Sequence, residues 1–170
     1  KEDEFSIVDT YVENFSEKVS VVVGKDYSSF PGSGAAGGLG YAFLSFLDST
    51  IQSGSSFMIN YLDLEKKIQG IDIVITGEGK LDKQSYMGKA PIEIARIAKK
   101  FNKKVIFLAG SILDEELREL SSEDKELVDA SFSIQRRFLS LEKAMNKSVT
   151  KDNIEQTIKQ ILSILEFKNG

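Results

Sequence analysis

Acidic, amide and lysine side chains gather directly behind an apolar run in the middle of the chain. The apolar run, Ile71 to Thr76, has the composition of a buried parallel strand. The polar side chains that follow it are Glu78, Lys80, Asp82, Lys83, Gln84 and Lys89. Two carboxylates can share a magnesium ion, or one can act as a base while the other holds the metal. Lysines can neutralise phosphate oxygens, so these groups could carry out phosphoryl transfer, although a solvated charged loop would contain the same residue types.

The residues around this cluster indicate where it lies in the fold. Gly77-Glu78-Gly79 is expected to form a tight turn at the carboxyl end of the strand. A helix is expected from about Pro91 to Phe101, because proline suits the first turn of a helix. The cluster would then lie where the carboxyl end of a strand meets the amino end of a helix. Open α/β sheets bind their ligands in that crevice.

A second candidate site is the glycine-rich stretch from Gly32 to Gly40, which reads GSGAAGGLG. An apolar helix is expected directly after it, from Tyr41 to Leu47. A glycine-rich loop at the amino terminus of a helix offers free N–H groups to an anion. Small residues also let two helices pack closely, so both interpretations stay open at this point. The spacing does not match the G-x-G-x-x-G pattern of a dinucleotide site.

Strands and helices alternate along the second half of the chain. The other expected elements are a helix over residues 5–22, a short strand over Phe57–Ile59, a helix over Leu62–Ile68, strands over Val105–Ala109 and Ala130–Ile134, a turn at Gly110-Ser111, and helices that begin near Asp114, as an N-cap, and near Ser140. This order predicts an α/β fold with a parallel sheet and right-handed crossovers. Three strands make a small sheet, so we expect strands outside this chain to extend it. Residues 1–68 are mostly helical and are expected to form a different unit.

The composition excludes several classes of function. The chain has 170 residues, and its 22 basic and 26 acidic residues give a net charge of −4, which does not favour nucleic acid as a partner. The absence of cysteine and histidine excludes disulfides, a Ser-His-Asp triad, and thiolate or imidazole metal sites. A metal would be held by oxygen atoms, which favours magnesium. No apolar run is long enough to span a membrane, and we expect a cytoplasmic protein.

The motifs together are more specific than any one of them. They are Pro31–Gly40 (PGSGAAGGLG), Thr76–Asp82 (TGEGKLD), Gln84, Gly88–Pro91 (GKAP), Val105–Ser111 (VIFLAGS), Ser133-Ile134 and Ser140-Leu141-Glu142. In order and spacing, this set resembles the bacterial glycerate kinase family that includes the glycerate 2-kinases. The resemblance extends from about residue 5 to residue 165.

The resemblance implies an activity and a fold. The activity is ATP-dependent phosphorylation of D-glycerate to a phosphoglycerate, with Mg²⁺ as the metal. The family fold has two α/β domains with the active site between them, and one domain is Rossmann-like and assembled from both ends of the chain. By that pattern, residues 1–68 correspond to the C-terminal part of the middle α/β domain. Residues 69–170 correspond to the C-terminal part of the Rossmann-like domain, whose parallel sheet is incomplete in this chain.

The resemblance also assigns roles to matched positions. The expected catalytic residues are Glu78, Asp82 and Lys89, with Glu78 and Asp82 also the expected metal ligands. The expected substrate- or phosphate-binding residues are Ser33, Gly34, Gly37, Gly38, Lys80 and Gln84. Lys80 stands where arginine is common in the family, which keeps the positive charge.

Family members are longer, and by the resemblance their N-terminal half is missing here. We therefore expect a C-terminal fragment that does not turn over alone and whose partners are D-glycerate, ATP and the missing N-terminal half. The oligomeric state stays open, with a homodimer as one option. The alternative is a non-catalytic α/β domain that binds a small anionic or phosphorylated ligand. Arg136 and Arg137 follow a predicted strand and could clamp a carboxylate.

Overall fold

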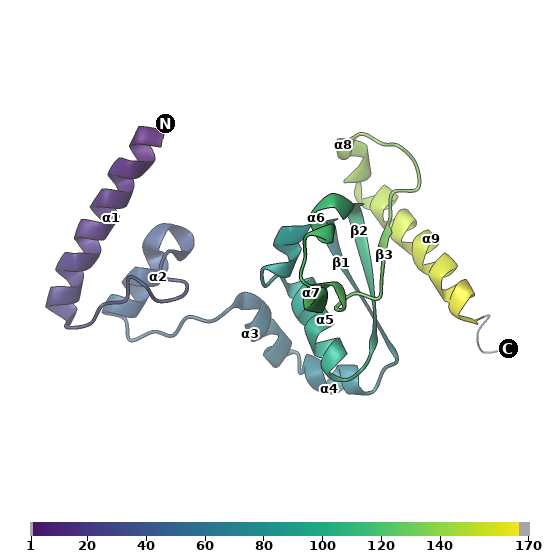
Figure 1. The fold of residues 1–170 in the computed structure, drawn as a ribbon, viewed down its shortest axis with the longest axis horizontal. Coiled ribbons are helices and arrows are strands. Elements are labelled where there is room, and N and C mark those ends of the chain that lie inside the picture. The colour runs from purple at the N-terminus through teal and green to yellow at the C-terminus, as the bar shows by residue number, and fades with distance from the viewer. Residues whose placement is uncertain (1, 167–170) are drawn as a thin grey trace. The chain divides into compact units, whose positions relative to one another are not determined.

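The computed structural model describes residues 2–166 of the chain. The chain forms two compact units, Lys1–Ser53 and Gly54–Gly170 (Figure 1). The domain boundary expected at residue 68, which rests on the family pattern, stays a prediction. Within the described range, no helix is both long and apolar enough to cross a membrane.

The first unit contains α1 (Glu2–Val23) and α2 (Ala35–Phe46). The helix predicted over residues 5–22 is confirmed, and it ends where Gly24 adopts a φ of 76° and donates its N–H to the Ser20 carbonyl at 2.8 Å. Left-handed φ values of this kind favour glycine and are common just past a helix. The two helices pack through Tyr41, which is buried and donates its hydroxyl to the Ser16 carbonyl at 3.0 Å.

The second unit is built on a parallel sheet. Within the described residues its strands are β1 (Ile73–Leu81), β2 (Lys104–Ile112) and β3 (Ala130–Ser133), paired in the order β1-β2-β3. The helices of this unit are α3 (Gly54–Tyr61), α4 (Leu64–Gln69), the 3₁₀ turn η1 (Lys83–Tyr86), α5 (Ala90–Lys100), α6 (Asp114–Arg118), α7 (Ser122–Lys125), α8 (Leu141–Ala144) and α9 (Lys147–Glu166). The predicted α/β fold with a parallel sheet is confirmed.

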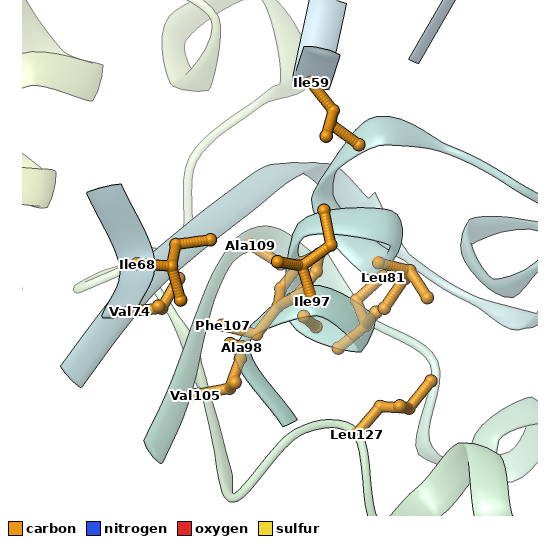
Figure 2. Packing of buried hydrophobic residues seen from close by; sticks show 12 residues of the cluster. Ile59, Ile68, Val74, Leu81, Ile97, Ala98, Val105, Phe107, Ala109 and Leu127 are labelled. Carbon is orange, nitrogen blue, oxygen red and sulfur yellow. The ribbon is translucent and has the colours of Figure 1, made fainter. Parts of the chain in front are cut away.

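Alternate side chains of β2 pack into two different hydrophobic clusters, one on each face of the strand. Val105 and Phe107 pack with buried residues of α5 on one face, in a cluster that also takes in Ile59 and Ile68 of α3 and α4 (Figure 2). Ile106, on the opposite face, packs with Ile161 of α9. Both faces of the central strand are therefore covered, which explains why its sequence is continuously apolar rather than alternating.

The short strand predicted over Phe57–Ile59 is wrong, because these residues lie in α3. Phe57 stacks on Tyr61 with ring centroids 6.0 Å apart, a pair four residues apart that a helix brings onto one face. Ile59 is buried in the α5 cluster. Packing against α5 therefore decides the conformation of a segment whose apolar run is too short to indicate one by itself.

The two glycine turns predicted at the strand ends are also wrong. Gly77 lies inside β1 and Gly110 inside β2, and the strands end only at Leu81 and Ile112, beyond the expected turns. A Cβ on Gly77 would lie 2.0 Å from the Leu108 carbonyl oxygen, and one on Gly110 would lie 2.6 Å from the Gly79 carbonyl oxygen. Glycine is needed here for the close approach of two backbones, not for a turn.

The helix starts follow two different patterns. Ser140 caps α8, and its Oγ accepts the Lys143 N–H at 3.5 Å. Asp114 was expected to cap α6, but the N-cap is Leu113 and Asp114 lies in the first turn. That position still suits an acid, because the amino end of a helix carries partial positive charge.

An ion-pair network around Asp129 joins α5 to the amino end of β2. Its carboxylate pairs with Lys99 and with Lys104 at 2.9 Å, and it accepts the Val105 N–H at 2.7 Å. Burial of Asp129 opposes its ionisation, but the hydrogen bonds from Lys99, Val105 and Lys104 outweigh it and lower the pKa to about 2. The folded state therefore holds this proton more weakly than the unfolded chain does.

We expect Asp129→Asn to lower the free energy of unfolding by about 2 kcal/mol at pH 7. Because the folded pKa is depressed, the stabilisation is present above pH 4 and is lost as the pH falls toward 2. Urea denaturation of both proteins across this range measures the effect, with Asp72→Asn, an exposed position, as the control. A stability difference that persists unchanged at pH 2 would contradict this explanation.

Candidate active site

A cavity of about 540 Å³ lies at the carboxyl ends of β1 and β2. Its walls include backbone of both strands at Gly77, Gly79 and Gly110, and apolar side chains of the last two helices such as Leu141 and Ile158. The volume is within the range of small-molecule sites. The crevice at this edge of a parallel sheet is also the usual ligand position in α/β folds.

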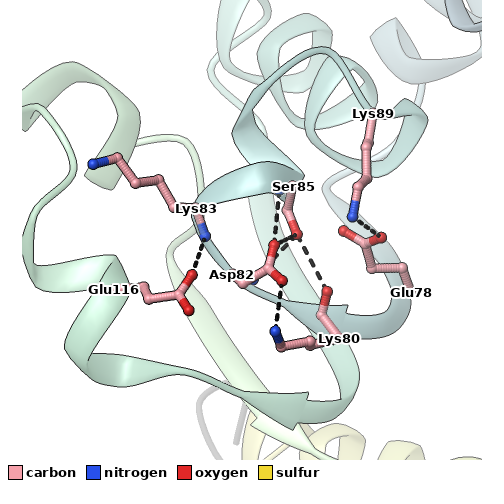
Figure 3. A network of polar contacts seen from close by, with 7 residues as sticks. All are labelled: Glu78, Lys80, Asp82, Lys83, Ser85, Lys89 and Glu116. Atoms are coloured by element: carbon pink, nitrogen blue, oxygen red, sulfur yellow. Dashed lines mark hydrogen bonds and ion pairs between the residues drawn. The ribbon is translucent and has the colours of Figure 1, made fainter. Parts of the chain in front are cut away.

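Glu78 brings a carboxylate to the wall of this cavity. Its Oε2 accepts a hydrogen bond from Lys89 Nζ at 3.2 Å, and its side chain is 19% exposed (Figure 3). Its Oε1 is buried and has no hydrogen-bond partner within residues 2–166. An unpartnered buried carboxylate oxygen costs free energy unless a ligand, metal or water satisfies it. Glu78 therefore has one oxygen held by lysine and one oxygen that is buried without a partner.

Local structure explains why Lys89 reaches this carboxylate. Lys89 is the N-cap residue of α5, with Pro91 in the first turn, so its side chain leaves from the amino end of the helix. Glu78 projects from β1 next to that helix end. The strand–helix junction predicted from the sequence thus brings Glu78 and Lys89 together, although the strand is longer than expected.

Asp82 has a different environment from Glu78. It caps η1: its Oδ1 accepts the Ser85 N–H at 3.1 Å, and Ser85 Oγ lies 3.2 Å from the Asp82 N–H (Figure 3). Its Oδ2 pairs with Lys80 Nζ at 3.0 Å. The hydrogen bond from Lys80, with help from the Ser85 N–H, lowers the pKa of Asp82 below its ordinary value. Both oxygens of this buried carboxylate are thus engaged within the loop.

Removing either half of this capping box is expected to destabilise the loop that carries Lys89. We expect Asp82→Ala and Ser85→Ala each to lower the melting temperature by several degrees, because each leaves buried partners unsatisfied. The double variant should lose less than the sum of the two single losses, since the residues contact each other. Thermal denaturation measures this, with Gln84→Ala, an exposed neighbour, as the control. Additive losses would argue against a shared box.

The other expected ligand-binding residues of the loop are exposed. Lys80 keeps its side chain half exposed while it pairs with Asp82, and this pairing raises the pKa of the lysine. Gln84 lies on the exposed side of η1. Their positions leave both side chains accessible to a ligand, and their roles stay predictions.

The glycine-rich stretch has an unusual backbone inside α2. Ala36, Gly37 and Gly38 have φ values of 52°, 68° and 94°, so left-handed residues interrupt the start of this helix. Ser33 donates its hydroxyl to the Ser28 carbonyl at 2.9 Å. A Cβ on Gly40 would lie 2.1 Å from the Gly32 carbonyl oxygen, which explains a glycine there by close backbone contact.

A cavity of about 940 Å³ lies beside this stretch in the first unit. The four residues expected to bind phosphate, Ser33, Gly34, Gly37 and Gly38, all line it. Acidic residues of α1, Asp9, Glu13 and Glu17, line it too. The structure therefore brings the four predicted residues together, next to carboxylates that a bare phosphate would have to avoid.

Some residues of these sites were not predicted from the sequence. Ser85 is fully buried and completes the box with Asp82, and the D-x-x-S spacing is the signal that could have identified it. Gln135 and Thr150 supply polar groups to the cavity wall beside Glu78. They come from segments after β3, so only the fold brings them there.

A magnesium ion would find a limited set of ligands here. Within residues 2–166, no three acidic side chains cluster closely enough to hold a metal ion. The free Oε1 of Glu78 fits one ligand position, whereas the oxygens of Asp82 are already engaged. Mg²⁺ commonly takes one or two carboxylates and completes its shell with water and substrate phosphates. The site is compatible with such a partial set.

Comparisons with known proteins give a consistent result. The model of the glycerate kinase family matches residues 1–166. A glycerate kinase of Bacillus cereus is 38% identical over 139 residues, which cover 82% of this chain and 35% of that protein. The glycerate 2-kinase of Escherichia coli is 35% identical over 158 residues, which cover 93% of this chain and 40% of that protein.

A solved structure agrees with the sequence matches. The crystal structure of a Salmonella typhimurium protein assigned as glycerate kinase 2 superposes with a TM-score of 0.70 and 32% identity. The match covers 95% of this chain and 40% of that one. This chain thus spans about two fifths of the length of the relatives that it matches.

Proposed function

The chain belongs to the glycerate kinase family, and we propose that it is the C-terminal part of an enzyme that phosphorylates D-glycerate to a phosphoglycerate with ATP. The proposal rests mainly on the carboxylate of Glu78. One of its oxygens pairs with Lys89, and the other is buried without a partner. Glu78 also lines a cavity at the carboxyl ends of the strands. A positioned carboxylate, a cation and a cavity are what phosphoryl transfer requires of a protein.

Glu78 is the group that we propose to act on the reacting hydroxyl. Its free oxygen can accept a hydrogen bond from that hydroxyl and take its proton as the hydroxyl attacks the phosphoryl group. Lys89 holds the other oxygen at 3.2 Å and thereby fixes the carboxylate in one orientation. The same lysine adds positive charge near the developing charge on the phosphoryl oxygens.

Magnesium and the exposed lysine supply further charge in this proposal. When bound, Mg²⁺ neutralises negative charge on the phosphates. Within this chain, the oxygens of Asp82 are engaged by Ser85 and Lys80. Because the free oxygen of Glu78 is the proposed base, we propose that substrate phosphates, water and the rest of the enzyme hold the ion. Asp82 then acts by holding the loop, and Lys80 and Gln84 contact substrate from the exposed side of that loop.

The remainder of the enzyme is proposed to be supplied by sequence that the longer relatives contain and this chain lacks. β1 pairs with β2 along one edge, and within the described residues no strand pairs with its other edge. A strand from the rest of the protein can add there and extend the sheet. We therefore propose that the 170-residue chain is inactive alone, and that the complete enzyme works in the cytoplasm, where ATP is available. A homodimer stays a prediction.

A chimaera tests the proposal. The N-terminal part of the Bacillus cereus glycerate kinase is joined to this chain, and the product of ATP and D-glycerate is identified by phosphorus NMR. We expect a phosphoglycerate signal that requires both D-glycerate and Mg²⁺. A folded chimaera that consumes no ATP in the presence of D-glycerate would contradict the proposal.

A further inference from the structure

Two adjacent arginines, Arg136 and Arg137, lie just past the carboxyl end of β3. Both are exposed, and both line a cavity of about 520 Å³ whose other wall is the start of α9. The lining residues are Arg136, Arg137, Ser148, Val149, Asp152 and Asn153. None of these residues lines the cavity beside Glu78, so this is a second, separate recess of the same unit.

The arginines have no partner for their charge. Within the described residues, neither Arg136 nor Arg137 makes a hydrogen bond or an ion pair through its side chain, whereas Arg96 pairs with Asp124 at 2.7 Å. Two like charges on neighbouring residues repel each other, and a guanidinium group offers a planar fork of donors suited to a carboxylate or a phosphate. An anion in the recess would relieve the repulsion and use those donors.

A buried amide gives independent support. Asn153 is only 7% exposed, and its Nδ2 has no hydrogen-bond partner within the described part of the chain. It lines the recess with the arginines. Such an amide group normally finds an acceptor. The residue that carries this unpaired donor therefore lines the same cavity as the two unpaired arginines.

The start of α9 contributes one feature that favours an anion in the recess and one that opposes it. The amino end of a helix favours negative charge, although Asn146 Oδ1 already accepts the Ser148 N–H at 3.0 Å. Asp152 lies in the same wall and opposes an anion. Two arginines and one aspartate give the recess a net charge of one positive unit.

We propose that Arg136, Arg137 and Asn153 form a binding site for the oxyanion group of a small molecule, a phosphate or a carboxylate. The arginines supply charge and paired donors, and the Asn153 amide donates to a further oxygen. The site does not depend on the kinase reaction and is distinct from the Glu78 cavity.

Calorimetric titration of the 170-residue chain with inorganic phosphate, and separately with D-glycerate, tests the site and distinguishes the two oxyanions. Ionic strength is held constant with chloride. We expect saturable binding of at least one oxyanion, weakened about tenfold by Arg136→Ala or Arg137→Ala. Asp152→Asn should strengthen it, because it removes the opposing charge. Lys66→Ala, which removes one exposed positive charge on α4, is the matched control and should leave binding unchanged.

Three results would overturn the proposal. They are no saturable binding of either anion, equal weakening by Lys66→Ala and the arginine variants, and unchanged binding in Asp152→Asn. The substituted residues at 66, 136, 137 and 152 are exposed, so folding should be preserved. Circular dichroism of each variant checks this. Binding that survives in Glu78→Gln separates the site from the proposed kinase chemistry.

Discussion

Glu78→Gln is expected to lower kcat for D-glycerate phosphorylation in the chimaera by about a hundredfold to ten-thousandfold, the usual contribution of a positioned general base. Glutamine has nearly the shape of glutamate but cannot take a proton. The Oε1 that is buried without a partner is the atom whose chemistry the substitution removes. KM for D-glycerate should change much less than kcat, because the effect falls on the transition state.

The matched control for this substitution is Glu119→Gln. Glu119 also pairs with a lysine, Lys83, at 3.3 Å, but both side chains are exposed and lie outside the cavity. Glu119→Gln removes the same charge as Glu78→Gln. It should leave kcat within about twofold of the unsubstituted chimaera, since exposed ion pairs contribute little. Steady-state kinetics of both variants give the comparison. Equal losses in the two variants, or a Glu78→Gln enzyme with full activity, would show that Glu78 does not act on the substrate.

Gly77→Ala is expected to destabilise the second unit by about 3 kcal/mol or more, which is the upper range for forcing extra atoms into a packed interior. A Cβ at this position would lie 2.0 Å from the Leu108 carbonyl oxygen, a backbone atom that can move only if β1 and β2 separate. Register pairs Gly77 directly with Leu108, so the disturbance falls in the middle of the central strand pair.

Gly79→Ala is the control for this prediction. A Cβ on Gly79 would meet no atom within 4 Å, and we expect unchanged or slightly higher stability because alanine restricts the unfolded chain. Urea denaturation followed by circular dichroism compares the two variants with the parent protein. If Gly77→Ala and Gly79→Ala have the same midpoint, close strand approach does not explain the glycine at position 77.

Gly77 and Gly110 show why the strands could be predicted from the sequence more reliably than the ends of those strands. Apolar runs such as Val105–Ala109 predicted the strands correctly, because a buried parallel strand needs continuous apolar residues. Glycine at positions 77 and 110 predicts turns, but glycine is typical both of turns and of close backbone contacts. The choice between them depends on a neighbouring strand far away in the chain, and local sequence carries no information about that neighbour.

The sequence also predicted only part of the candidate site, because it does not show which polar groups the loop itself engages. Glu78 and Lys89 were expected at the junction of a strand and a helix, and the structure pairs them at 3.2 Å. Asp82 was given the same expected role as Glu78 because both are acids in one polar stretch. Only the geometry separates them: Asp82 is engaged by its own loop, whereas Glu78 lines the cavity.

We propose that this chain supplies the reacting carboxylate of a glycerate kinase and needs the rest of the protein to use it. The most direct measurement is the single-turnover rate of transfer of the labelled γ-phosphoryl group from ATP to D-glycerate in three samples. These are the 170-residue chain, its chimaera with the N-terminal part of a relative, and that chimaera carrying Glu78→Gln. We predict no transfer by the isolated chain, transfer by the unsubstituted chimaera, and transfer at least about a hundredfold slower in the substituted chimaera. Transfer by the isolated chain, or equal rates in the two chimaeras, would contradict the claim.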